Sequence, residues 1–481
     1  MIPARYSRIA AYTAGLALFA WFAYLIRGGL TSWFDNDDLM NLHYYWSRPW
    51  PALLKANLCF WSSYYRPGGG LFYRVIFAIW GFHPLPFHIA SFILLCLDFA
   101  LLAVVVYRLT GSRWGTLLAL LVLGIHPAFV DAYLSTGTIY DVLAYAFFWA
   151  AFAWYVRQRQ AGRLPGAAAT VLLLCLFAAA LDSKEIAVLW PVAVALYEVV
   201  WHPPADWKPA GLWRWIRREG RLAAIGAIFD LAFIIGKRYG PDSLWQVEAY
   251  RPHYSLGAYI GSLSSYLHEF VDRLDLKPLQ MVALIVAMAV VAAVSRRRCL
   301  IWSVGFILAG ILPLAFIPGR GGFAYLVPAV GWAVYVAGLG DWLLELATGK
   351  YAWVRAAAQI LILAVLARQL SGWQRRVIGE HTAAAHNMQH RFLRYEQQIR
   401  ALIPAPAKGA RILLLTDADG YHDWDVYFLI RLMYGDPQLQ AERMTVWREN
   451  HVQVDPRKYP YVLDYANGAF NLVSPVSGPP S

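Results

Sequence analysis

The sequence has few charged residues and very few cysteines. Charged side chains make up 15% of the 481 residues, whereas a soluble domain typically carries about 25%. The four cysteines show no C-x-x-C spacing, and three of them, Cys96, Cys175 and Cys299, lie in or beside apolar runs. The cysteines therefore indicate neither a zinc site nor a disulfide framework, and the scarcity of charge argues against a water-soluble protein.

Apolar side chains are abundant instead, at 59% of the sequence. Apolar runs of roughly 17–22 residues recur, the length needed to cross a bilayer. We therefore predict an all-α polytopic membrane protein with about eleven spans. The first run follows Arg5 and Arg8 and has no convincing cleavage site after it, so we expect a retained helix. The expected cores are 9–26, 88–107, 115–133, 139–156, 166–181, 186–201, 222–236, 279–294, 300–317, 323–343 and 353–370.

The basic residues predict the orientation. A net charge of +12 is compatible with nucleic-acid binding, but the basic residues lie mainly in short connections between apolar runs, where they orient a membrane protein, so we expect no nucleic-acid partner. Lys and Arg are concentrated on one side if the N-terminus is cytoplasmic, and an odd number of spans then places the C-terminus outside. We expect an integral protein of a bacterial inner membrane with an extracytoplasmic C-terminal domain.

The chain divides into a membrane domain, 1–370, and a small α/β domain, 371–481. Two outer segments of the membrane domain, 27–87 and 237–278, are too long for simple turns, and LFYRVIFAIWG at 71–81 is typical of an interfacial helix. In the C-terminal part, 373–402 predicts an amphipathic helix. RILLLTD, RMTVW and YPYVLDY predict strands, and WDVYFLIRLMYGD predicts a helix ended by Gly435.

Unusual polar residues gather at the outer ends of the predicted spans. Ionisable groups at membrane depth are costly and tend to be functional, so this gathering predicts an outward-facing pocket that holds acids and bases. The residues are Asp35, Asp37 and Asp38 after the first span, His126 and Asp131 at the third, Lys184 and Glu185 between the fifth and sixth, Lys237 and Arg238 after the seventh, and Arg320 before the tenth.

Each feature has a structural alternative. The Asp cluster could be a solvated loop, and Arg320 could anchor to lipid headgroups. The DSKE turn at 182–185 could form an internal salt bridge. His126 and the following Pro127 could form a packed kink.

Other polar residues have structural or metal interpretations as well. Asp98 and Asp230 fall in the middle of spans, where interhelical hydrogen bonds are expected. The D-N-D pattern at 35–37 leaves a divalent metal possible but not favoured, and the spacing of His126 and Asp131 argues against a simple metal pair. We expect no cofactor.

Five stretches follow one another along the chain: FDNDDLMNL, YYRPGGGLFYRVIFAIWGFHPLPFHIASFIL, GIHPAFVDAYLSTGTIYDVLAY, LDSKEIAVLWP and PGRGGFAYLVPAVG. In these stretches and in their order, the sequence resembles the GT-C superfamily of membrane glycosyltransferases. It is similar above all to the protein O-mannosyltransferase branch and the transmembrane-and-tetratricopeptide mannosyltransferases. The resemblance covers most of residues 30–330. An extra Asp35, an Asp131 where relatives often carry Glu, and the absence of tetratricopeptide repeats depart from the family pattern.

The resemblance implies an enzyme that uses a polyprenyl-phosphate sugar as donor and inverts the anomeric carbon. Asp37 would be the general base, with Asp38 and Asp131 orienting it or the acceptor. Arg320 and Lys184 would stabilise the leaving phosphate. The acceptor could be a protein, a glycan or a lipid. The residues expected to bind substrate are Asp35, Arg66, His126, Asp131, Lys184, Glu185, Lys237, Arg238, Arg320 and Tyr325. A transporter or flippase of a lipid-linked saccharide is the alternative, but such proteins usually show two related halves, which this sequence lacks.

Overall fold

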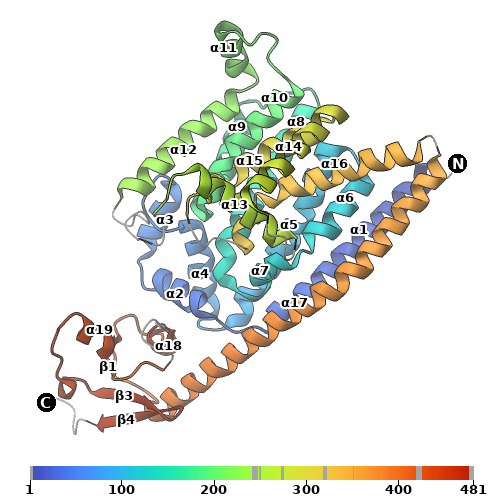
Figure 1. Ribbon diagram of the computed structural model, residues 1–481. Coiled ribbons are helices and arrows are strands. Elements are labelled where there is room, and N and C mark those ends of the chain that lie inside the picture. Colours follow the sequence, from blue (N-terminus) through green and yellow to red (C-terminus); the bar gives the residue numbers. More distant parts are fainter. Residues whose placement is uncertain are drawn as a thin grey trace.

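A bundle of long helices forms most of the molecule, and one helix connects it to a small domain that contains a sheet (Figure 1). The computed structural model describes residues 4–240, 248, 251–271, 276–317, 322–349, 351–418 and 425–475. The helical elements of the first half of the chain are α1 (Ala4–Ile26), η1 (Arg27–Thr31), α2 (Asn36–Trp46), α3 (Trp50–Leu58), α4 (Pro67–Trp80), α5 (Pro84–Thr110), α6 (Arg113–Ala119), η2 (Leu120–Gly124), η3 (Pro127–Phe129), α7 (Val130–Leu134), η4 (Thr136–Thr138), α8 (Ile139–Gln160), α9 (Ala167–Ser183), η5 (Glu185–Leu189), α10 (Trp190–Trp201), α11 (Pro209–Arg218) and α12 (Arg221–Tyr239).

The second half completes the bundle and adds the sheet domain. Its elements are α13 (Leu256–Phe270), α14 (Pro278–Ser295), α15 (Arg298–Gly310), η8 (Gly322–Tyr325), α16 (Ala329–Thr348), α17 (Ala352–Leu402), β1 (Arg411–Leu414), α18 (Asp425–Tyr434), β2 (Gln440–Arg443), α19 (Met444–Glu449), η9 (Pro456–Lys458), β3 (Tyr461–Ala466) and β4 (Ala469–Pro475).

In the described part of the chain, six helices are long and apolar enough to cross a membrane, and a bent pair makes a possible seventh. They support the prediction of an all-helical polytopic membrane protein. Eleven spans are not shown, because the expected spans at 166–181, 186–201, 222–236 and 300–317 correspond to α9, α10, α12 and α15, which do not meet the same test. For example, α15 ends at Gly310, shortly before Pro313, which has no N–H to continue a helix.

The bent pair is the predicted third span, which is broken at His126 and Pro127. The helix axes on the two sides differ by 52°. Pro127 supplies no backbone N–H, and the buried His126 caps the short helix that follows by accepting from the Ala128 N–H at 3.2 Å. The other ring nitrogen, Nε2, lies 3.0 Å from the Phe270 carbonyl oxygen. This is the arrangement expected of a packed kink.

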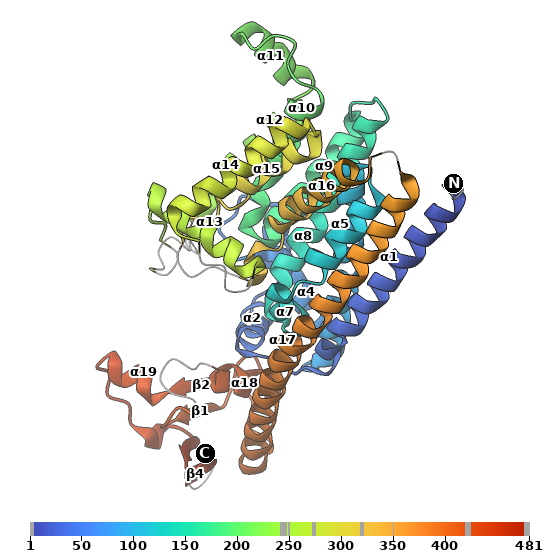
Figure 2. The ribbon, with the colours of Figure 1, turned by 45° about the vertical axis from the view of Figure 1, so that its right-hand side comes forward.

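Helix α17 joins the predicted last span to the predicted amphipathic helix without a break. It has 51 residues, and it runs along the bundle and beyond it to the sheet domain (Figure 2). The sequence predicted an interruption near residue 371 because the polarity changes there. The segment is nevertheless rich in Ala, Arg, Gln and Leu, which favour helix on either kind of surface. The helix stops two residues before Pro404.

The C-terminal domain has a four-stranded sheet in the order β2-β1-β3-β4. β1 is parallel to β2 and β3, and β3 pairs with β4 in an antiparallel hairpin. Asn467 and Gly468 both have positive φ at its turn, as tight hairpin turns require. The predictions of β1, α18 and β3 are confirmed. The prediction of a strand at RMTVW is wrong, because β2 ends at Arg443 and α19 begins at Met444.

Candidate active site: carboxylates and a basic cluster at the start of helix α8

Two of the three clustered carboxylates cap helix α2. The Asp35 carboxylate accepts from the Asp38 N–H at 2.8 Å, and the Asp38 carboxylate accepts from the Asp35 N–H at 3.1 Å. This reciprocal capping box satisfies backbone donors that a helix start otherwise leaves unpaired. It explains locally why the chain turns into a helix directly after the first span.

Asp38 also binds η4, which directly precedes α8. Its side chain is fully buried, and the Thr136 hydroxyl donates to it at 2.7 Å. Burial raises the pKa of Asp38 well above its ordinary value, and the nearby carboxylate of Asp35 raises it further. Burial likewise raises the pKa of Asp35. Asp38 therefore serves to hold α2 against η4.

Asp37 differs from both neighbours because its side chain is exposed on the first turn of α2. It lies close to Gly137: a Cβ added to Gly137 would be 2.8 Å from the Cβ of Asp37. Glycine at this position therefore permits the close approach of α2 to η4. Asp37 is the carboxylate of the three that a substrate could reach from solvent.

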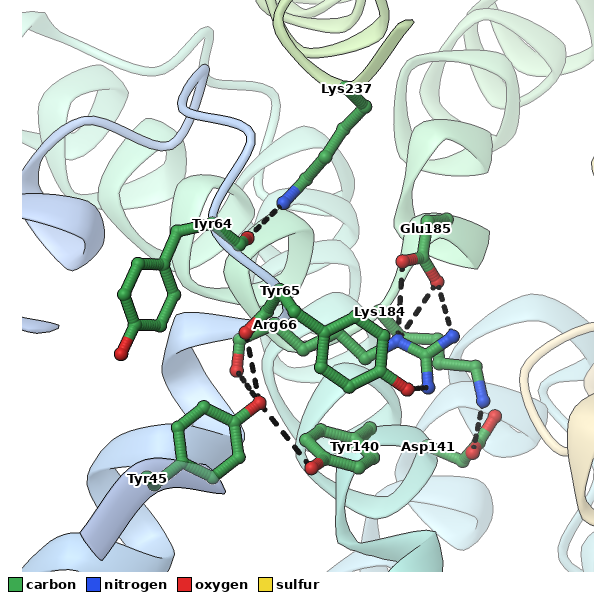
Figure 3. Close-up of polar contacts among 9 residues, drawn as sticks. All are labelled: Tyr45, Tyr64, Tyr65, Arg66, Tyr140, Asp141, Lys184, Glu185 and Lys237. Atoms are coloured by element: carbon green, nitrogen blue, oxygen red, sulfur yellow. Dashed lines mark hydrogen bonds and ion pairs between the residues drawn. The ribbon is translucent and has the colours of Figure 1, made fainter. Parts of the chain in front are cut away.

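A basic cluster begins with Arg66, at the N-terminal end of α4 (Figure 3). Its guanidinium donates to both carboxylate oxygens of Glu185, at 3.0–3.2 Å, and to the Tyr65 hydroxyl at 2.8 Å. The backbone of Arg66 is left-handed, with φ 36°, a costly conformation for a residue with a side chain. The Tyr45 hydroxyl donates to the carbonyls of Tyr65 and Arg66, at 2.9 and 3.2 Å, and helps hold this conformation.

Two lysines extend the cluster. Lys184 donates to the Asp141 carboxylate at 2.7 Å, and its ammonium lies 5.6 Å from the centre of the Phe323 ring. Lys237 donates to the Tyr64 carbonyl at 2.5 Å (Figure 3). The alternative of a salt bridge inside the DSKE turn is therefore wrong, because Lys184 and Glu185 each pair with a different segment of the chain.

The charged groups of the cluster shift one another's pKa values. Burial opposes the ionisation of Glu185, but Arg66 and Lys184 outweigh it and lower its pKa to about 2. Burial and the neighbouring Arg66 lower the pKa of Lys184, although Asp141 acts in the opposite direction. Arg66, Lys184 and Lys237 lie near the carboxylates of Glu185, Asp141 and Asp182, so this region holds three cations among three carboxylates.

The first turn of α8 connects the two groups of residues. Thr136 and Gly137 contact the carboxylates of α2, and Asp141 lies four residues after Gly137, about 6 Å further along the axis. The glycines in the first turn of α4 have a packing role here. A Cβ at Gly69 would overlap the Tyr140 ring, at 2.2 Å. The segment from Thr136 to Asp141 therefore contacts both the carboxylates of α2 and Lys184 of the basic cluster.

Other predicted site residues make separate contacts, although Asp131 also lies near enough to Asp35 to raise its pKa. Asp131 is about half exposed and pairs with His381 at 3.0 Å. Buried Tyr325 packs against Tyr266, with 4.4 Å between the ring centroids. Arg238 is exposed, with its guanidinium over the Tyr239 ring. His126 belongs to the kink described above.

Arg320 lies outside the described residues, and the structure gives no test of its predicted role.

Sequence reasoning missed Thr136, Tyr140 and Asp141. They lie in TGTIYDVLAY, a stretch that carries the resemblance, but none of them had been singled out. A carboxylate in the first turn of a predicted span was the available signal for Asp141. Its pairing with Lys184 depends on the tertiary fold.

In the described residues, no group of three or more His, Cys, Asp or Glu side chains is arranged to hold a metal ion. No known family profile matches the sequence, and a search of curated proteins finds no significantly similar chain.

Proposed function

We propose that the protein is a membrane glycosyltransferase that moves a sugar from a polyprenyl-phosphate donor to an acceptor hydroxyl on the outer face of the membrane. One observation carries the proposal: the exposed Asp37 packs against Gly137 of η4, and Asp141, four residues further along the chain, pairs with Lys184 of the cluster that also contains Arg66 and Lys237. Glycosyl transfer from a lipid phosphate needs a base for the acceptor and cations for the leaving phosphate.

In the proposed reaction, the Asp37 carboxylate takes the proton from the acceptor hydroxyl. The acceptor oxygen attacks the anomeric carbon, and the bond from that carbon to the phosphate oxygen breaks. The polyprenyl phosphate leaves with the bonding electrons, and the configuration inverts. Lys184 donates one of its three N–H groups to Asp141. The other two can donate to the phosphate. Arg320 keeps its predicted role as a second phosphate partner.

The test compares wild-type protein with Asp37→Asn in liposomes that contain a radiolabelled polyprenyl-phosphate sugar and cell-envelope extract. We expect wild type to move label out of the lipid fraction and the variant to do so at least about 10²-fold more slowly, because general base catalysis is worth 10²–10⁴-fold. Asp455→Asn, an exposed carboxylate in the C-terminal domain, is the matched control. A fully active Asp37→Asn variant would refute the assignment of the base. Label that stays on the lipid but changes leaflet in both proteins would identify a flippase instead.

A further inference from the structure

A second polar region lies at the opposite end of the bundle, where α10 leads through α11 into α12. The connection 202–221 carries five basic residues, Lys208, Arg214, Arg217, Arg218 and Arg221, and two acidic ones, Asp206 and Glu219. α11 stands away from the other helices at this end of the molecule (Figure 1). The distribution of Lys and Arg predicts that this end faces the inner leaflet of the membrane.

Helix α11 is strongly amphipathic. At 100° per residue, Arg214, Arg217 and Arg218 occupy one arc of the helix, and all three are exposed. Trp213 borders this arc and is 54% exposed. The Arg217 guanidinium lies over its ring, 4.6 Å from the centroid. Cations next to an exposed indole are typical of a helix that lies in a membrane interface.

Contacts with the preceding segment attach α11 to the end of the bundle. The Trp215 indole N–H donates to the His202 carbonyl at 2.7 Å, and Gly211 packs closely on Asp206. Behind this contact, Arg159 of α8 is buried and bonds to Glu198, at 2.8 and 2.9 Å, and to Glu219. The charge of Glu219 is therefore largely balanced from within the protein.

A hollow of about 330 Å³ lies between α11 and the end of α10. Its lining includes His202, Asp206, Arg214, Arg218 and Glu219. Arg214 and Arg218 are four residues apart and so lie one above the other on the helix. Arg218 makes only a long contact to Glu219, at 3.4 Å, with its side chain 78% exposed. Within the described residues, Arg214 makes no hydrogen bond or ion pair.

We infer that α11 and this hollow form a binding site for the headgroup of an anionic phospholipid of the inner leaflet. Two guanidiniums on one helix face can grip a phosphate through paired N–H donors. Trp213 would enter the interface beside them, and the net positive charge of the connection would favour anionic over zwitterionic lipid. The site is separate from the outer carboxylates and basic cluster, so it would fix the enzyme in the membrane without contacting its substrates.

The test measures binding of tritiated short-chain phosphatidylglycerol to the full-length protein in detergent, by scintillation proximity, with phosphatidylcholine of the same chain length as comparison. We expect phosphatidylglycerol to bind more tightly. The variant Arg214→Gln/Arg218→Gln should weaken this binding about fivefold for each arginine removed. Arg163→Gln, an exposed arginine in the neighbouring inner turn, is the control and should leave binding unchanged.

Two further measurements distinguish a lipid-binding site from a site that binds any phosphate. Trp213→Ser should weaken lipid binding, because the indole would lie among the acyl chains. Soluble glycerol phosphate should compete poorly. Equal binding of phosphatidylcholine, an equal loss in Arg163→Gln, or efficient competition by glycerol phosphate would each overturn the proposal.

Discussion

Individual residues of the candidate site are held more firmly than their sequence positions indicate. Asp35 and Asp38 are part of a capping box, and Asp38 is buried against Thr136. The side chain of Arg66 is held by Glu185, and its strained backbone is held by the Tyr45 hydroxyl. Such fixed groups cost little reorganisation when charge develops in a transition state. Asp37 differs in being exposed, as the base of the proposed reaction has to be.

Gly137→Ala tests the close approach of α2 to η4. The added Cβ would be 2.8 Å from the Cβ of Asp37, so the first turn of α2 would have to move. A misplacement of about 1 Å can cost about 10²-fold in rate, and we expect a loss of that order in sugar transfer with little change in thermal stability. Gly261→Ala is the control, since an added Cβ there meets nothing within 4 Å. Unchanged transfer by Gly137→Ala would show that Asp37 need not be placed accurately.

Glu185→Gln tests the Arg66 pair. The pKa of Glu185 falls to about 2 in the folded protein, below its ordinary value, so the ion pair stabilises the fold above about pH 4.5 and this contribution is lost as the pH falls toward 2. We expect the variant to lose about 1–2 kcal/mol at neutral pH, less than a fully buried pair would lose, because a third of the Glu185 side chain is exposed. Thermal unfolding in detergent at pH 7 and pH 3 measures this. If the difference in stability between variant and wild type did not shrink at pH 3, the Arg66–Glu185 ion pair would not be its source.

At the scale of elements, α2 connects the carboxylates to the C-terminal domain. α18 packs against α2, and the ring of His43 lies near the rings of Trp46, Tyr427 and Phe428. Burial, and then the nearby Arg431, lower the pKa of His43 to about 4. The contact between the two helices therefore favours the neutral imidazole.

This contact predicts a pH dependence of docking. Because the pKa of His43 in the docked state lies below its ordinary value of 6.5, docking is strongest above about pH 6.5 and weakens as the pH falls toward 4. Hydrogen exchange of α18, corrected for the intrinsic effect of pH, should show less protection at pH 5 than at pH 7.5. His43→Phe, which cannot take up a proton, should remove most of that difference. If His43→Phe lost as much protection between pH 7.5 and pH 5 as wild type does, another titrating group would be responsible.

At the scale of the whole molecule, α17 joins the bundle to the C-terminal domain and fixes its position. The Arg400 guanidinium donates to the Met433 carbonyl at 2.7 Å, and the Phe470 N–H donates to the Gln398 side chain at 3.1 Å. The domain is therefore attached to the same helix that packs along the bundle (Figure 2), and its helix α18 packs against α2.

Deletion of residues 405–481 tests what this domain contributes. α2 keeps its contacts with α4 and η4 without the domain, so we expect sugar transfer to persist with a loss of less than about tenfold, alongside a lower thermal stability. Transfer is normalised to the amount of folded protein measured by size exclusion. Complete loss in a folded truncated chain would show instead that the domain binds the acceptor.

The sequence by itself determined the features that depend on local pattern. Apolar run length predicted the helical membrane class, Gly435 predicted the end of α18, and a packed kink at His126 and Pro127 was one of the alternatives that the sequence left open. These features arise from backbone chemistry and from burial within one segment. The same reasoning wrongly placed a strand at RMTVW, because short apolar runs do not distinguish helix from strand.

Only the tertiary structure decided which polar groups meet. Lys184 pairs with Asp141 rather than within its own turn, and Arg66 pairs with Glu185, 119 residues away along the chain. No local pattern contains such pairings, since they depend on how α4, α8 and η5 pack. The same holds for the three aspartates: they are alike in sequence, but packing against Thr136 buries Asp38, whereas Asp37 remains exposed.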